Sequence, residues 1–221
     1  SLDNAANDFG SFSATATERP GGSVRVTDSN DLTLRGINVN NGDVAVRTGG
    51  DLGLAGDIFA GTGSVALDSL ADIDLMGDVA IFAADSTLDA TFGALNFDLF
   101  GSAETEYDQL SFSGTARIIG TFDFLLGNLF APTVGDEFNL IEALSLDLTA
   151  VTFTLPTLAH GLFFESSLIR VDERDVFRLS VNGSPVPVPE PGALGMTLLG
   201  LLLLGVGRRL RCGHRDRLVA R

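Results

Sequence analysis

The chain of 221 residues has very few of the side chains that carry redox, metal-binding or aromatic chemistry. It contains one cysteine, two histidines, one tyrosine, no tryptophan and no lysine. Because Cys212 has no second thiol to pair with, no disulfide can form within the chain. A cluster of Cys and His metal ligands is excluded as well. The fold must therefore be stabilised by side-chain packing and backbone hydrogen bonds.

Basic side chains are also scarce, and they are unevenly distributed. The chain has 14 basic and 29 acidic residues, a net charge of −15. Residues 189–221 hold six arginines and two acids, a net of +4, whereas residues 1–188 hold eight arginines and 27 acids, a net of −19. So negative a charge disfavours binding to nucleic acid or to anionic lipid. The asymmetry predicts that the two parts lie in different compartments.

The C-terminal region combines a proline-rich linker, an apolar run and a basic end. Alternating prolines favour an extended linker over residues 183–191. The uncharged run 192–207 has 16 residues, somewhat fewer than the roughly 20 of a comfortable membrane span. We expect a transmembrane helix there, since a buried core helix would show a polar face. Basic flanks stay cytoplasmic, so residues 208–221 are the expected cytoplasmic tail. The basic stop consists of Arg208, Arg209 and Arg211.

These features resemble the PEP-CTERM sorting signal of Gram-negative bacteria, which exosortase enzymes process. The triplet that carries the resemblance is Pro189, Glu190 and Pro191. The resemblance implies that this triplet is the recognition site, that an exosortase-type enzyme is a partner, and that the chain is its substrate. It extends from the triplet to the end of the chain. The segment 212–221 departs from the pattern, because family members usually stop soon after the arginines.

The N-terminal end carries no secretion signal. Ser1 opens a polar stretch without a basic or an apolar region. Since an exported protein needs such a signal, we expect this chain to be a C-terminal fragment or a processed form. The expected location is the cell envelope, with a periplasmic or extracellular ectodomain anchored initially through residues 192–207.

Aliphatic side chains recur at intervals of 20 and 21 residues in the first part of the chain. Aspartate and glycine recur at the same interval, so the segments form one repeating unit. The columns are Val24, Val44 and Val65; Val26, Val46 and Leu67; Leu32, Leu52 and Ile73; Leu34, Leu54 and Leu75; Asp31, Asp51 and Asp72; and Gly36, Gly56 and Gly77.

Within each unit, apolar residues alternate with small or polar ones, which is typical of half-buried strands. A unit of this length predicts one coil of a β-solenoid, or parallel β-helix, in which each coil pairs with its neighbours. An antiparallel sandwich also has alternating strands, but the fixed period favours the solenoid. Residues 31–36 and 51–56 are similar to filamentous haemagglutinin-type and autotransporter-passenger solenoids. That similarity implies an adhesin-like surface protein.

Strands with larger side chains, many of them phenylalanine, replace the repeats after residue 106. A solenoid needs a cap because its last coil exposes core and strand edges. The predicted fold class is all-β: a β-solenoid with a C-terminal β cap, followed by a proline-rich linker and one transmembrane helix. The predicted domains are the repeats 1–106, the cap 107–182, the linker 183–191, the helix 192–207 and the tail 208–221.

Residues suited to catalysis are few, and we expect no catalytic residue. No nucleophile elbow or phosphate-binding loop occurs, and His160 lies in a segment typical of a loop. Parallel β-helices do host polysaccharide-cleaving enzymes, so carboxylates could pair for acid–base chemistry. Aspartate at a coil corner is, however, usually a turn former. The candidate carboxylates are Asp51, Asp57, Asp72, Asp74 and Asp78.

Calcium is the one cofactor that the repeat allows. If Asp31, Asp51 and Asp72 stack in register, like charges recur at the coil spacing and favour either a raised pKa or a bridging cation. The Gly-Gly-x-Gly-x-Asp calcium motif is absent. Solvated corner aspartates are therefore the default interpretation, and no cofactor is expected otherwise.

The sequence predicts an exported cell-surface or biofilm-matrix protein with a structural, adhesin-like role and no enzymatic activity. Two alternatives remain open: a carbohydrate-active solenoid enzyme and a polysaccharide-binding surface protein. Extracellular polysaccharide is thus a further candidate partner. The binding alternative needs exposed aromatic platforms, and the lack of tryptophan disfavours it.

Overall fold

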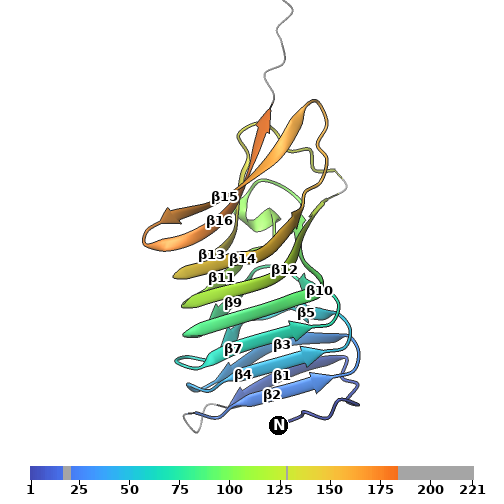
Figure 1. The fold of residues 1–221 in the computed structure, drawn as a ribbon, viewed down its shortest axis with the longest axis vertical. Helices are drawn as coiled ribbons and strands as arrows, with labels where there is room; N and C mark the ends of the chain where they lie inside the picture. Colours follow the sequence, from blue (N-terminus) through green and yellow to red (C-terminus); the bar gives the residue numbers. More distant parts are fainter. Residues whose placement is uncertain (17–20, 128, 184–221) are drawn as a thin grey trace, which may run out of the picture. The chain divides into compact units, whose positions relative to one another are not determined.

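The computed structural model describes residues 1–16, 21–127 and 129–183, which belong to one compact unit. The described residues form 16 strands and one short 3₁₀ helix, Glu104–Glu106, and all the strands belong to one sheet. The sheet winds through successive coils that lie one above another, as the stacked arrows in Figure 1 show. The strands at its two ends do not pair with each other, so the sheet is open.

Parallel pairing between coils builds three ladders, and several strands bend from one ladder into the next. The first ladder holds β2 (Val24–Asp28), β4 (Val44–Thr48), β7 (Ser64–Ser69) and the first parts of β10 (Asp85–Leu99), β12 (Thr115–Leu126) and β14 (Ser145–Thr154). The second holds the first parts of β1 (Ser11–Ala16) and β3 (Leu32–Val39), then β5 (Leu52–Leu54), β8 (Ile73–Leu75) and the later parts of β10, β12 and β14. The third holds the later parts of β1 and β3, then β6 (Ile58–Phe59), β9 (Val79–Phe82), β11 (Leu110–Phe112) and β13 (Glu137–Ala143).

The register of the ladders confirms the aliphatic columns that the repeat predicted. The opposed residues are Val24, Val44 and Val65; Val26, Val46 and Leu67; Leu32, Leu52 and Ile73; and Leu34, Leu54 and Leu75. All except the half-buried Val24 are at most 6% exposed. Because alternate side chains of a strand point to opposite faces, one face of each ladder fills the core while the other faces solvent.

The later coils are longer than the repeat. Asp85 pairs with Ser64 across one repeat length, but the next two steps of the ladder, from Asp85 to Thr115 and from Thr115 to Ser145, each span a longer stretch of chain. Part of the added length is a segment that leaves the coil after β10 and returns before β11. We call this segment, residues 99–108, the excursion. Larger side chains fill the core of these coils, and several of the rings are fully buried.

An antiparallel hairpin follows the last parallel strand. It consists of β15 (Leu162–Val171) and β16 (Arg174–Gly183), and β16 pairs with β13. Phe177 of β16 packs against the rings of Phe122, Phe124 and Phe153 at centroid distances of 5.4, 6.5 and 5.3 Å. Parallel pairing runs on from the predicted repeats into the predicted cap, as far as β14. Among the strands within residues 107–182, those of the hairpin are the ones that pair antiparallel.

The predicted fold class needs one correction. It included a transmembrane helix, but in the part of the chain that the structure describes no helix is long and apolar enough to cross a membrane. The fold that the described residues support is all-β, with an open sheet and a single 3₁₀ turn. Residues 192–207, to which the helix was assigned, lie outside the described residues.

Candidate functional site

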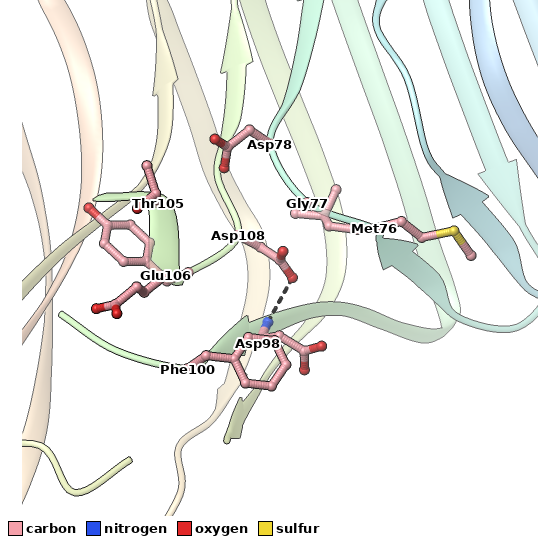
Figure 2. Close-up of a pocket in the computed structure, with 10 residues that line it drawn as sticks. Met76, Gly77, Asp78, Asp98, Phe100, Thr105, Glu106 and Asp108 are labelled. Carbon is pink, nitrogen blue, oxygen red and sulfur yellow. Dashed lines mark hydrogen bonds between the residues drawn. The ribbon is translucent and has the colours of Figure 1, made fainter. Parts of the chain in front are cut away.

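A cleft of about 470 Å³ opens beside the excursion, where the second ladder passes into the third (Figure 2). Its charged side chains are acidic and come from three separate elements: the connection between β8 and β9, strand β10, and the excursion. None of the described residues that line it is basic. Met76 and Phe100, with exposed fractions of 58% and 63%, add apolar surface. The acidic side chains are Asp78, Asp98, Glu106 and Asp108.

Backbone hydrogen bonds fix the excursion and bring these carboxylates together. An antiparallel bridge joins Leu99 to Tyr107, at the two ends of the excursion. The amide of Asp108 donates to the carbonyl of Asp98 at 3.0 Å, and the amide of Asp98 donates to Oδ2 of Asp108 at 2.8 Å. The Asp108 carboxylate thus links the returning chain to β10, as the dashed line in Figure 2 shows.

Asp108 has an unusual protonation equilibrium. The residue is 7% exposed. Burial raises its pKa from 3.8 to about 6, and the negative charges of Asp98 and Asp78 add to the rise. Hydrogen bonds from the backbone of Asp98 and Gly77 act in the opposite direction. Asp108 therefore changes charge in mildly acidic solution rather than near pH 4.

Asp98 belongs to the same acidic group. Burial raises its pKa, and the nearby charge of Asp74 raises it further. Asp74 itself accepts a hydrogen bond from the side-chain amide of Asn96 at 2.6 Å. Carboxyl groups with different environments in one cleft can serve as proton donor and proton acceptor. The cleft can also concentrate cations through its uncompensated negative charge.

The aspartates proposed as weak calcium candidates do stack, but their carboxylates bind the backbone of the next coil. Oδ1 of Asp31 accepts from the amide of Asp51 at 3.0 Å, and Oδ1 of Asp51 accepts from the amide of Asp72 at 3.1 Å. Oδ1 of Asp72 accepts from the amide of Ala94 at 2.8 Å. Among the described residues, no three His, Cys, Asp or Glu side chains gather as a metal site. Whether calcium binds this column stays a prediction.

The carboxylates considered for catalysis are not brought into one place. Besides Asp51 and Asp72, Asp57 also accepts a coil-to-coil hydrogen bond, from the amide of Ala80 at 2.9 Å. Asp78 alone of the five lines the acidic cleft. His160 lies in a turn with φ of 59°, so its expected loop position is confirmed.

The residues of the sorting signal lie outside the described residues. These are the triplet Pro189, Glu190 and Pro191 and the basic stop Arg208, Arg209 and Arg211. Their expected roles stay predictions.

Comparison with known proteins gives no family for the chain. No protein-family description matches the sequence, and no curated protein matches it. The fold defines a class, an open all-β stack of parallel coils.

Sequence reasoning missed Asp98, Glu106 and Asp108 as members of one cleft. They lie well beyond Asp78 in the chain and outside the repeating columns. The excursion brings them close to Asp78. An irregular segment of this kind has no sequence period from which it could be predicted. The one available signal was the change in composition near residue 101, where the aliphatic repeat ends.

Proposed function

We propose that this chain is an exported surface or matrix protein whose coil stack has a structural, adhesin-like role. Its C-terminal signal would be the substrate of an exosortase-type enzyme, and the stack itself would turn over no substrate. The observation that carries the proposal is the use of the repeated acidic side chains. They hold one coil to the next, as a protein needs when it must persist outside the cytoplasm without disulfides.

Coil-to-coil contacts from side chains support this role along the first ladder too. Thr48 and Ser69 lie opposite each other and are nearly fully buried, and their hydroxyl oxygens lie 3.3 Å apart. Both also donate to the carbonyl of Gly50 at 2.9 Å. Such satisfied buried polar groups rigidify a repeat stack, because breaking any of them leaves a desolvated group unpaired.

Processing of the C-terminal signal tests the sorting part of the proposal. In a host that contains an exosortase, we expect the mass of the wild-type chain to fall after processing. The Glu190→Ala variant should keep its full mass, whereas a matched Glu173→Ala change in the β15–β16 turn should be processed normally. Unchanged processing of Glu190→Ala would contradict the assignment of the triplet.

The acidic cleft favours one alternative function, cleavage of polysaccharide. Asp108, with a pKa of about 6, would be the proton donor, and Asp78 or Asp98 the second carboxyl group. This alternative predicts release of reducing ends from a polysaccharide, with an optimum in mild acid. It also predicts that Asp108→Asn abolishes the release while Asp31→Asn preserves it. The structural proposal predicts no release by any of the three proteins.

A further inference from the structure

We propose that a second, shallower groove, beside Phe59 at the start of the coil stack, binds an uncharged hexose unit of a polysaccharide. This inference deepens the adhesin-like role and rests on it only for the biological context. The groove has a volume of about 340 Å³ and lies along β1, β3 and the turn before β6. That volume is at the small end of the range for ligand sites, roughly 300 to 1,000 Å³.

The ring of Phe59 supplies the apolar wall of this groove. Phe59 lies opposite Phe82 in the third ladder, and the two rings stack at 4.5 Å with planes 5° apart. Phe82 therefore covers one face of the Phe59 ring from the following coil. The other face is directed toward the preceding coil.

Smaller side chains occupy the same column on that side. Asn38 lies opposite Phe59, and Thr15 lies opposite Asn38. Both are smaller than a phenyl ring and both line the groove, and Phe59 is 38% exposed. A sugar ring can pack against this exposed part of the phenyl ring, since the C–H groups of a pyranose meet the electron-rich face of an aromatic ring.

Polar groups with unused hydrogen-bonding capacity surround this ring face. Arg35 and Asn38 are exposed, and among the described residues neither side chain has a hydrogen-bond or ion-pair partner. Asp57 uses Oδ1 for the amide of Ala80, and its Oδ2 has no such partner there. Donors and acceptors of this kind match adjacent hydroxyl groups of a sugar, each of which both donates and accepts.

Two glycines fit the tight backbone at the corner beside the groove. Gly36 has φ of +112°, a conformation that residues with a Cβ rarely adopt. A Cβ on Gly56 would lie 2.9 Å from the carbonyl carbon of Arg35. The glycine column of the repeat therefore shapes this corner.

Charge selects the class of ligand. One arginine and one aspartate line the groove, so its own formal charge is balanced. The chain as a whole is acidic, which disfavours polyanions. Uncharged hexose polymers fit both observations better than uronic acid polymers do.

Affinity electrophoresis tests the proposal with laminarin, galactomannan and dextran as uncharged probes and alginate as an anionic probe. We expect at least one uncharged probe to retard the wild-type protein. Phe59→Ala and Asn38→Ala should each weaken that retardation about tenfold, the scale of a modest hot-spot loss. Phe59→Tyr should preserve it, because the ring face remains.

Phe92→Ala is the matched control, since Phe92 is 74% exposed and does not line the groove. It should bind like wild type. Asn38→Ala removes no hydrogen bond of the fold, so an unchanged melting temperature would separate loss of the site from loss of the stack. Failure of all three uncharged probes to retard the folded wild type would overturn the proposal, as would undiminished binding by Phe59→Ala. Either result would leave the structural role standing.

Discussion

At the scale of single residues, one buried polar atom without a hydrogen-bond partner lowers the stability of the core. Ser86 continues the column of Val24, Val44 and Val65, since it lies opposite Val65, and it is 4% exposed. Its hydroxyl has no hydrogen-bond partner among the described residues. An unpaired buried hydroxyl costs about 1 to 3 kcal/mol. The position is thus a local defect in an otherwise aliphatic column.

Replacing Ser86 by Ala should increase the free energy of unfolding by about 1 kcal/mol, because it removes the unpaired hydroxyl at little cost in volume. Ser69→Ala is the contrasting control in the same ladder. Its hydroxyl donates to the carbonyl of Gly50 at 2.9 Å and accepts from the amide of Ala71 at 3.1 Å, so its loss should destabilise the fold. Urea denaturation measures both. A Ser86→Ala variant less stable than wild type would show that the hydroxyl is satisfied.

Asp108 should make stability depend on pH in an unusual direction. Its pKa in the fold is about 6, above the 3.8 of an unperturbed aspartate, so between these values the folded state binds more protons than the unfolded state. Its contribution to stability is therefore full below pH 4 and is lost as the pH rises through 6. Hydrogen bonds lower the pKa values of Asp43 and Asp147. Their contribution to stability is therefore lost as the pH falls, and only near and below pH 4.

Asp108→Asn should raise the free energy of unfolding at pH 7 by on the order of 2 kcal/mol and flatten its change between pH 5 and 7. The asparagine keeps an oxygen that can accept from the amide of Asp98. Chemical denaturation at pH 5, 6 and 7 measures the slope. If the free energy of unfolding of the variant depends on pH as steeply as that of the wild type, another group takes up the proton.

At the scale of elements, the aspartate column at the corners joins coils of different sequence. Each of these carboxylates accepts a hydrogen bond from a backbone amide of the next coil. These bonds fix the corners at which the chain enters the second ladder. The aliphatic columns on either side could be predicted because they repeat at one period. The excursion and the antiparallel hairpin could not, since their contacts join segments that share no period. The acidic cleft depends on the excursion and was missed for that reason.

Asp51→Ala should lower the free energy of unfolding by about 1 kcal/mol, because the amide of Asp72 loses its acceptor. Asp51→Asn keeps an acceptor and should cost less. Addition of millimolar calcium should leave the melting temperature of the wild type unchanged relative to a chelator. A rise that disappears in Asp51→Asn would instead establish a bridging cation.

At the scale of the whole molecule, the core changes in kind along the stack. Small aliphatic side chains fill the early coils, whereas rings fill the later ones and the hairpin, where Phe177 contacts three other rings. A repeat stack is stabilised by contacts between neighbouring coils, and its terminal coils need a cap because their outer edges are otherwise unpaired. The hairpin protects one end by covering the aromatic core and pairing with β13.

Phe177→Ala should therefore destabilise the fold by about 3 to 5 kcal/mol, the usual cost of truncating a buried phenylalanine. Phe92→Ala, at a position 74% exposed, should change stability little. Thermal unfolding followed by circular dichroism compares the two. Equal melting temperatures for both variants would mean that the hairpin does not stabilise the stack.

Residues 24–99 form parallel coils held together by coil-to-coil hydrogen bonds. Hydrogen exchange followed by mass spectrometry measures this pairing strand by strand. We predict that peptides covering β4, β7 and the first part of β10 exchange slowest and open together, because each of these segments pairs on both sides. The outer strand β15 should exchange faster. Rapid, independent exchange across β4, β7 and β10 would contradict the stack.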